Sequence, residues 1–249
     1  MNEPSQYLGP MIKGTIDGLS ITVRPGTVLL NAARTLGIHI PTLCHHEGLP
    51  PDGNCRLCVS QVGGRLVASC IYPLTADGFQ AQTDNERIRY ARSLVIALML
   101  IRAPEAPVVV ALAREYGVTE QPRLRRVTAD GCLRCGRCVR ACLTGGAEAV
   151  SLVGRGTARI VTGPFFEPPP DCVGCLSCAR MCPTGIIGFT ELFDRRQIWG
   201  RNFQLVPCPT CGRPWATEEE LARLNADRLC PACRRRAMAE AISSCPTEN

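Results

Sequence analysis

Residues 132–142 read CLRCGRCVRAC, and residues 172–183 read CVGCLSCARMCP. Each stretch carries four cysteines at the spacing C-x2-C-x2-C-x3-C, which is the spacing of thiolates that hold iron–sulfur clusters. Because two copies of this long pattern stand in one chain, we expect two [4Fe–4S] clusters here rather than structural zinc. The repeat predicts a dicluster domain of the bacterial 2[4Fe–4S] ferredoxin type over residues 128–195.

Paired runs of this kind exchange their last ligand, so that the fourth cysteine of each run binds the cluster of the other run. One [4Fe–4S] cluster is therefore expected on Cys132, Cys135, Cys138 and Cys182. The other is expected on Cys172, Cys175, Cys178 and Cys142. The exchange brings the two clusters close together, as electron transfer between them requires.

Three arginines, Arg134, Arg137 and Arg140, alternate with the cysteines of the first run. Their charge suits the attraction of an acidic partner or the stabilisation of reduced clusters. Solvated arginines on a short helix are an equally good interpretation of the same pattern.

The whole chain has 249 residues, 17 cysteines and a formal net charge of +6. Its start, MNEPSQYLGPM, lacks the basic and apolar stretches of a secretory signal. We therefore expect a cytoplasmic protein whose cysteines bind metals instead of forming disulfides. Its strongest apolar run, Leu94–Ile101, is too short to span a membrane. The arginine excess is interpreted as counter-charge for metal–thiolate sites, and nucleic acid is not expected as a partner.

A further group of cysteines, Cys44, Cys55, Cys58 and Cys70, precedes the repeat. Around it, MIKGTI and LSITV flank Asp17-Gly18, and LCVSQV and RLVASC flank Gly63-Gly64, which predicts two β-hairpins. A helix between the hairpins is expected to have Thr27 as its cap and to end at Gly37. Two hairpins around one helix predict a β-grasp core over residues 11–84. The cysteine spacing suits a [2Fe–2S] cluster, with zinc as the alternative.

Three histidines, His39, His45 and His46, lie near the loop of this group. Because four cysteines already complete the coordination of a cluster, we expect none of these histidines to bind metal. A solvated or hydrogen-bonded position at the rim of the cluster is expected instead.

The stretch over residues 16–62 strongly resembles the N-terminal [2Fe–2S] domain of one family, and GNCRLCVSQV and LVASC are the most specific pieces. The members of this family are the large iron–sulfur subunit of NADH:quinone oxidoreductase (respiratory complex I), the small diaphorase subunit of NAD-linked hydrogenases, and the formate dehydrogenases that share the domain. GCLRCGRCVRAC and RMCPTG resemble the same family, so the likeness covers residues 12–190. It implies a [2Fe–2S] cluster on the first group of cysteines.

Residues 85–127 are expected to form a helical connector. Asp84 or Asn85 would cap a helix that Pro104 ends, with an apolar stripe of Ile88, Ala91, Val95, Leu98 and Ile101. In the resembled family, a histidine and cysteine box that binds another [4Fe–4S] cluster usually follows this helix, ahead of a segment similar to ALAREYGV. Here APEAPVVV, residues 103–110, stands in place of the box. The family's additional cluster is therefore expected to be absent.

The C-terminal residues 204–249 contain a last group, Cys208, Cys211, Cys230 and Cys233. Two C-x2-C pairs at this separation are typical of a zinc ribbon, and TEEELARLNADR between them predicts a helix with Thr217 and Glu220 as a capping box. A rubredoxin-type iron and a further cluster are the alternatives to zinc. Four cysteines leave no open position for substrate, so we expect a structural site in a module that docks another subunit. Cys245 falls outside every group.

Together these patterns predict an α+β protein that binds one [2Fe–2S] cluster, two [4Fe–4S] clusters and one zinc ion. The sequence has no dinucleotide-binding G-x-G-x-x-G loop after a strand, so we predict a non-catalytic electron-transfer subunit of an oxidoreductase complex. The family resemblance implies a flavin/NAD(P)-binding iron–sulfur subunit as one partner. It implies a catalytic subunit as the other, of a nickel–iron hydrogenase in the first place or of an NAD-linked formate dehydrogenase. A free-standing ferredoxin-like shuttle and a redox-sensing regulator are the alternatives.

Overall fold

The computed structural model describes residues 9–119 and 129–243, and all elements named below lie within them. The first part of the chain is a five-stranded sheet with the strand order β2-β1-β7-β4-β5. Its strands are β1 (Ile12–Ile16), β2 (Leu19–Val23), β4 (Val59–Val62), β5 (Arg65–Ala68) and β7 (Phe79–Gln82). Neighbouring strands are antiparallel except for β1 and β7, which run parallel.

Both hairpins predicted from the sequence are present, because β1 pairs with β2 and β4 pairs with β5. Asp17 and Gly18 have φ angles of 51° and 82°, and Gly63 and Gly64 have φ angles of 53° and 79°. Positive φ at both central residues is the property of type I′ turns, whose twist matches that of the flanking strands.

Helix α1 (Leu29–Thr35) packs into the core of this sheet, where Leu29, Leu30 and Ala33 are completely buried. The short strands β3 (Thr27–Val28) and β6 (Pro73–Leu74) pair beside it. The predicted cap is wrong: the hydroxyl of Thr27 donates at 2.7 Å to the carbonyl of Arg24, and Val28 stands at the cap position. Thr27 belongs to a strand pair, which holds it in the turn before the helix.

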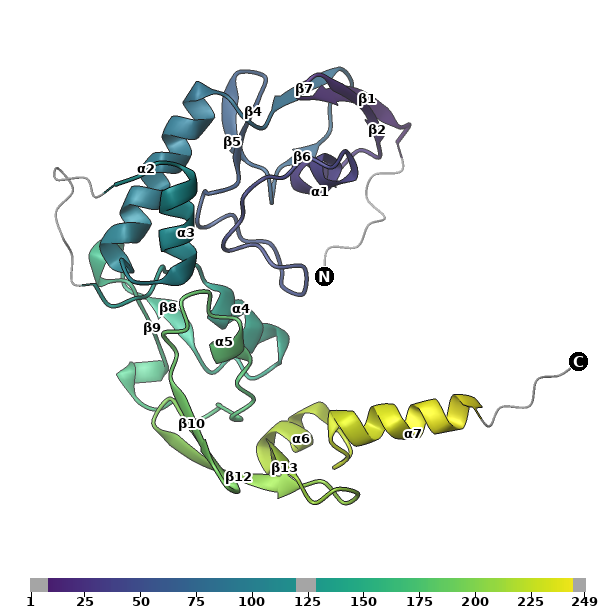
Figure 1. Cartoon of the computed structure of the whole chain (residues 1–249), viewed down its shortest axis with the longest axis vertical. Helices are drawn as coiled ribbons and strands as arrows, with labels where there is room; N and C mark the ends of the chain where they lie inside the picture. The colour runs from purple at the N-terminus through teal and green to yellow at the C-terminus, as the bar shows by residue number, and fades with distance from the viewer. Residues whose placement is uncertain (1–8, 120–128, 244–249) are drawn as a thin grey trace, which may run out of the picture.

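The connector consists of two helices packed side by side, α2 (Glu86–Arg102) and α3 (Pro107–Glu115), as Figure 1 shows. Asn85 caps α2, accepting from the amide of Ile88 at 2.9 Å, as the sequence predicts. The predicted apolar stripe is wrong in part, since Leu98 is 50% exposed. The buried face of α2 instead includes Arg92 and Ile96. A polar residue lies on this face because its long side chain reaches main-chain carbonyls in the interior.

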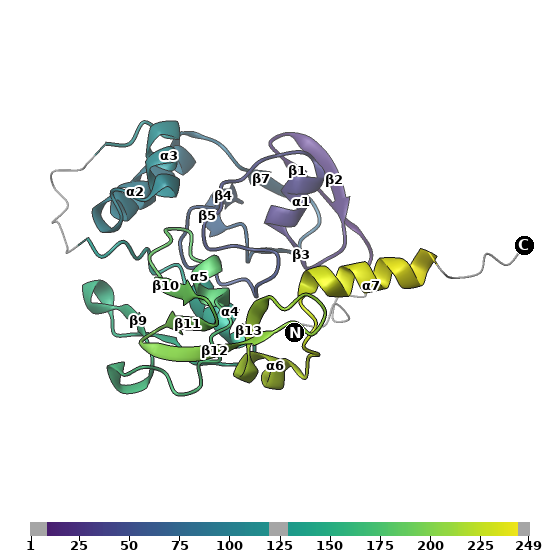
Figure 2. The same cartoon turned by 60° about the horizontal axis from the view of Figure 1, so that its bottom comes forward.

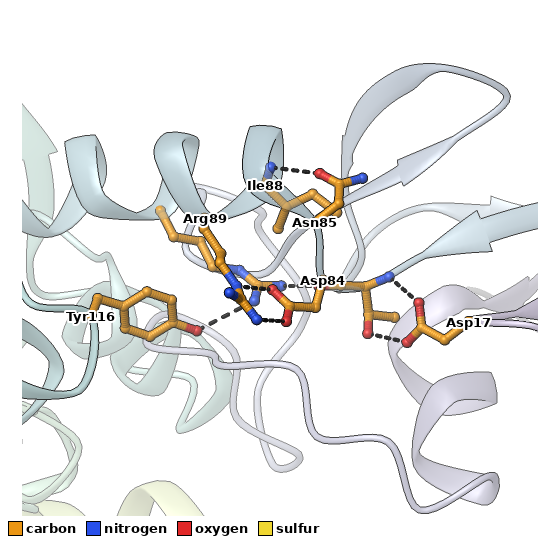
Figure 3. A network of polar contacts seen from close by, with 8 residues as sticks. Asp17, Asp84, Asn85, Ile88, Arg89 and Tyr116 are labelled. Carbon is orange, nitrogen blue, oxygen red and sulfur yellow. Dashed lines mark hydrogen bonds and ion pairs between the residues drawn. The ribbon is translucent and has the colours of Figure 1, made fainter.

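Figure 3 shows how the start of α2 is tied to the first sheet. The amide of Thr83 donates at 2.7 Å to Asp17, and the Thr83 hydroxyl donates to the same carboxylate. Asp84 and Arg89 form an ion pair at 2.5 Å across the first turn of the helix. The contacts of Thr83 with Asp17 fix the direction in which α2 leaves the sheet.

Arg92→Met should destabilise the protein, because the buried Arg92 guanidinium donates to the carbonyls of Val59 at 2.8 Å and Thr83 at 2.9 Å. Leaving both carbonyls without a donor costs about 3 kcal/mol, which lowers the thermal midpoint of a domain of this size by about 6–12 °C. Scanning calorimetry of the iron-loaded protein measures the shift. Arg89→Met, on the same helix but exposed, is the control and should leave the midpoint unchanged; equal shifts for both variants would contradict the role assigned to Arg92.

The part that carries the two long cysteine runs has little regular structure. It contains α4 (Arg137–Thr144), the antiparallel pair β8 (Ser151–Val153) and β9 (Ile160–Thr162), and α5 (Ser177–Arg180), with the short 3-10 turns η2 (Gly156–Ala158) and η3 (Pro164–Phe166). Helices α4 and α5 lie against each other. Each starts within one cysteine run, so their packing brings the two runs together.

A four-stranded antiparallel sheet follows, with the order β10-β11-β12-β13. Its strands are β10 (Phe189–Leu192), β11 (Arg195–Ile198), β12 (Arg201–Pro207) and β13 (Pro214–Thr217), and the helices α6 (Glu218–Leu224) and α7 (Pro231–Ser243) complete the chain. We call β10–β13 the C-terminal sheet. It crosses the boundary expected between residues 128–195 and 204–249. Figures 1 and 2 show α7 projecting from the rest of the molecule.

The mixed α+β class predicted from the sequence is confirmed by these elements. Thr217 caps α6 as expected, accepting from the amide of Glu220 at 3.0 Å. In the described residues, no helix is both long and apolar enough to cross a membrane.

Candidate metal centres

The first group of cysteines gathers at one end of the first sheet. Cys44 and Cys55 lie in the loop between α1 and β4, Cys58 lies just before β4, and Cys70 lies just after β5. The amide of Cys44 donates to the Cys55 sulfur at 3.4 Å, and the thiols of the group lie close enough to shift one another's pKa values. The structure thus brings the four predicted ligands together at one end of the first sheet.

This packing already stabilises negative charge on sulfur. Hydrogen bonds from the thiols of Cys55 and Cys70 lower the pKa of Cys44 to about 2, and a bond from Cys70 lowers the pKa of Cys58 to about 7. The thiolate is the form of cysteine that binds metals. The donor set, four converging sulfurs of which two favour the thiolate, fits a [2Fe–2S] cluster.

Two histidines near this loop, His45 and His46, differ in their hydrogen bonding. His46 accepts from the amide of Gly48 at 3.1 Å, so it is hydrogen-bonded as expected. Both ring nitrogens of His45 are buried, and no group within the described residues hydrogen-bonds to them. Burial lowers the pKa of His45, which favours the neutral ring.

A cavity of about 420 Å³ is lined by thiols from both long cysteine runs. Its cysteines are Cys132, Cys135, Cys138 and Cys182, and its apolar walls include Ile160, Ile186 and Trp199. Cys182 ends the second run, yet its thiol faces the first three. This is the set of four that the exchange of last ligands predicts, and a cavity with four thiols and apolar walls fits a [4Fe–4S] cluster.

A second, smaller cavity is lined by Cys142, Cys172, Cys175 and Cys178. Cys142 stands on α4, at the end of the first run, and so completes the exchange. Burial raises the pKa of Cys138 to about 12 and that of Cys178 to about 11. Metal binding to these thiols must therefore displace protons, as the formation of metal–thiolate bonds generally does.

The loop of the first group packs directly on the first long run. One hydrophobic cluster contains Cys44, Leu57 and Cys135 together with residues of α2 and α3. The side-chain amide of Asn54 donates at 2.6 Å to the carbonyl of Arg134. The two sites are thus neighbours in a single interior.

Arg140 of α4 joins the two parts. It is 8% exposed and donates to the carbonyls of Pro50, at 2.5 Å, and Cys44. Arg134 is similarly buried and pairs with Asp130. Solvated arginines are therefore the wrong interpretation for these two positions, because Arg140 satisfies carbonyls across the junction and Arg134 donates to the carbonyls of Cys132 and Arg159.

Arg140→Met should loosen this junction without removing iron. Protection of the amides in residues 43–57 from hydrogen exchange should fall about tenfold or more, since a buried pair of carbonyls loses a charged donor. Arg180→Met is the matched control, because Arg180 holds the equivalent place in the second run and is exposed. Unchanged exchange in Arg140→Met would show that Arg140 does not hold the two parts together.

Apolar side chains occupy the turn where the resembled family carries its extra box. Ala103, Ala106 and Val109 are buried in the cluster that also contains Cys44 and Cys135. Residues 103–110 contain neither histidine nor cysteine. This turn therefore supplies packing and no ligand.

The last group of cysteines forms a compact site between β12 and α7. The sulfurs of Cys208, Cys211, Cys230 and Cys233 all lie within 4.8 Å of one another. The amide of Cys230 donates to the Cys208 sulfur at 3.4 Å and lowers the pKa of Cys208 to about 6. The site can hold a metal ion. Cys245 lies outside the described residues.

Three residues that contact the second cysteine run were not anticipated from the sequence. Trp199 donates to the sulfur of Cys178, and Arg196 and Arg201 donate to carbonyls beside Cys172 and Cys175. They lie in strands and turns after the second run, where spacing carries no signal of a contact with it.

Comparison with known proteins agrees with a 2Fe-2S domain in the first part of the chain. Residues 9–86 match the family model of a 2Fe-2S iron-sulfur cluster binding domain. The chain is 31% identical to the NADPH-Fe(3+) oxidoreductase subunit alpha of Geobacter sulfurreducens, over 81% of this chain and 27% of that protein. It is 33% identical to the NADP-reducing hydrogenase subunit HndD of Solidesulfovibrio fructosivorans, over 76% of this chain and 37% of that protein. The chain thus spans about a quarter to about a third of these curated relatives.

A solved structure extends the likeness to the fold. A chain in the crystal structure of an NAD+-reducing [NiFe]-hydrogenase in the H2-reduced state superposes with a TM-score of 0.59 and 30% identity, over 70% of this chain and 85% of that chain. One component of an NADH-quinone oxidoreductase of Rhizobium meliloti is 32% identical, over 81% of this chain and 27% of that protein. The chain therefore belongs to the family of iron–sulfur subunits that NAD(P)-linked hydrogenases and NADH:quinone oxidoreductases share.

Proposed function

We propose that this protein is the electron-transfer iron–sulfur subunit of a cytoplasmic, NAD(P)-linked oxidoreductase complex. One observation carries the proposal: twelve cysteines converge in three groups of four, and two of these groups meet in one hydrophobic cluster through Cys44, Cys55 and Cys135. Cysteines of proteins in a reducing compartment bind metals more often than they form disulfides, which supports the cytoplasm as the location. Iron–sulfur clusters, when bound, take up and release single electrons.

The protein's residues would hold the clusters and exclude water from them. We assign one [2Fe–2S] cluster to Cys44, Cys55, Cys58 and Cys70. We assign the [4Fe–4S] clusters to Cys132, Cys135, Cys138 and Cys182, and to Cys142, Cys172, Cys175 and Cys178. The shared hydrophobic cluster supports the passage of electrons from the [2Fe–2S] site to the site of Cys132, Cys135, Cys138 and Cys182, across the junction that Arg140 holds.

We further propose zinc for the last group of cysteines. A tetrahedral ion with zinc–sulfur bonds of about 2.3 Å has its sulfurs about 3.8 Å apart, and the sulfurs of Cys211 and Cys230 are separated by 3.8 Å. Each thiolate of a [4Fe–4S] cluster binds a different iron, which spreads the sulfurs more widely. This spacing favours a single ion over a cluster, and zinc over iron because no further redox centre is needed.

The family supports a proposal for the partners. A flavin/NAD(P)-binding iron–sulfur subunit would dock near the [2Fe–2S] site, and a catalytic subunit near the [4Fe–4S] sites. The coverage of 85% of a chain of an NAD+-reducing [NiFe]-hydrogenase supports a nickel–iron hydrogenase as the catalytic partner. An NAD-linked formate dehydrogenase is the partner to compare in the experiment below.

Affinity purification of the protein from its own cells without oxygen tests the proposal. The expected result is a flavoprotein and a catalytic subunit that co-purify, and about ten irons and one zinc in this chain once it is separated from them. A monomer without stable partners would support a free ferredoxin-like shuttle instead. Salt-dependent binding to nucleic acid would support a redox-sensing regulator.

A further inference from the structure

The C-terminal sheet lies directly against the loop that carries Cys172 and Cys175. Side chains from three of its strands and from one turn contact this loop or a neighbouring cysteine: Arg196 of β11, Trp199 between β11 and β12, Arg201 of β12 and Thr217 of β13. No comparable set of contacts is needed to hold the sheet itself together, because its strands pair by main-chain hydrogen bonds. These side-chain contacts therefore hold the cysteine loop that lines the second cavity.

Trp199 donates directly to one of the assigned ligands. Its indole Nε1 lies 3.3 Å from the Sγ of Cys178, and its ring lines both thiol-lined cavities. A hydrogen bond to sulfur favours the negatively charged form of that sulfur. On a bound cluster, the same N–H stabilises the additional negative charge that reduction brings.

The carbonyls of the ligand loop are held away from the cavity. Those of Cys172, Val173 and Gly174 each accept a hydrogen bond from the C-terminal sheet. The donors, in the same order, are Arg201 at 2.8 Å, the Thr217 hydroxyl and Arg196 at 2.6 Å. Because a trans peptide carries its N–H opposite its carbonyl, the N–H groups of this loop face away from the sheet.

Arg196 and Arg201 differ in what surrounds their charged groups. Arg196 is 3% exposed, and Glu191 at 2.6 Å and Glu220 at 3.6 Å offset its charge. Arg196 is therefore a positioning residue that orients the loop. Arg201 stacks over the ring of Phe203, with 5.1 Å between its guanidinium carbon and the ring centroid, and also donates to the carbonyl of Pro169 at 3.0 Å.

The matching loop of the first run has one charged and one neutral side-chain donor, since the Arg134 guanidinium donates at 3.3 Å to the carbonyl of Cys132. The carbonyl of Arg134 accepts from the neutral amide of Asn54 at 2.6 Å. At the first cavity, the Cys182 sulfur lies 3.4 Å from the hydroxyl of Thr184. Guanidinium groups thus serve the loops of both sites, but within the described residues a side-chain N–H donates to a ligand sulfur at the second site, from Trp199, and at none of the four sulfurs of the first.

We propose that the C-terminal sheet, through the N–H of Trp199 and the orientation of the Cys172–Cys175 loop, makes the second [4Fe–4S] site easier to reduce than the first. This inference rests on the proposed function, since it needs clusters at both sites. The step is a transfer of one electron from the first site to the second, in which no bond forms or breaks and no proton moves. The electron then resides beside the C-terminal sheet before it leaves for a partner.

Trp199→Phe tests the inference, because it removes the N–H and keeps an aromatic ring. The iron-loaded full chain is titrated with reductant while electron paramagnetic resonance follows each cluster, and the Cys182→Ala background identifies the second-site signal. We expect the ratio of reduced to oxidised second site at a fixed potential to fall about tenfold, which is about 59 mV for one electron. Trp215→Phe is the matched control: its Nε1 donates at 3.0 Å to the carbonyl of Arg228, and it should cause no shift.

The outcomes separate the two proposals. An unshifted second-site potential in Trp199→Phe at full iron content overturns the inference about the sheet. About six irons in the unmodified chain, where about ten are expected, overturns the cluster assignment instead. If Trp199→Phe itself loses iron, Arg201→Met is used instead. A lower second-site reduction potential in Arg201→Met supports the inference, and an unchanged potential overturns it.

Discussion

Cys182→Ala should remove the cluster of the first cysteine run, although Cys182 ends the second run. Its thiol lines the cavity that also contains Cys132, Cys135 and Cys138. Loss of one of four thiolates leaves an iron without a protein ligand, so we expect about six irons per chain in place of about ten. Iron and sulfide analysis with electron paramagnetic resonance measures the loss. Cys245→Ser, at the cysteine outside all four groups, is the control and should keep the full iron content.

A background without the second site distinguishes exchanged from unexchanged ligands. In a chain that already carries Cys172→Ala and Cys175→Ala, exchanged ligation predicts that Cys182→Ala lowers the iron content to about two per chain. Unexchanged ligation predicts about six, because the first site would not use Cys182. In the same background, Cys142→Ala should change nothing. Iron loss with Cys142→Ala and not with Cys182→Ala would overturn the assignment.

Removal of the metal from the last group of cysteines should unfold the C-terminal module. The hydrophobic cluster beside these cysteines contains few apolar residues, among them Val206, Ala216 and Leu221. Structural zinc contributes about 10–16 kcal/mol to such small modules, which exceeds what this cluster can supply. A zinc chelator, or Cys208→Ala, should therefore expose residues 208–243 to proteases and hydrogen exchange while the [2Fe–2S] signal persists. Cys245→Ser should remain protected.

Two results would contradict this prediction in different ways. Residues 208–243 that stay protected after complete loss of zinc would show that packing alone holds the module. A module purified with iron and no zinc would contradict the choice of metal and leave the tetrahedral site itself in place. Since Thr217 lies in this module and donates to the loop of the second site, metal loss should also alter the second-site signal.

Features with short sequence separation were predicted well. The two turns, Asp17-Gly18 and Gly63-Gly64, need residues that tolerate positive φ, and the structure has these angles. The caps at Asn85 and Thr217 depend on a side chain and an amide three residues later. The predicted cap at Thr27 was wrong because Thr27 pairs with Leu74 in a short strand. Leu74 is distant in sequence, so the local pattern around Thr27 carries no information about this pairing.

The sequence by itself determined how the cysteines divide into groups of four, because a ligand set needs a fixed number of thiols on short, regularly spaced loops. Only the tertiary structure decided what surrounds each group. Arg140 satisfies the carbonyl of Cys44, 96 residues away in the chain, and Trp199 reaches Cys178 from a turn after the second run. Such contacts depend on how separate segments pack and on buried polar groups finding partners. For this reason the number of candidate metal centres follows from the spacing of the cysteines. How the centres pack together, and the reduction potentials proposed for them, follow from the fold.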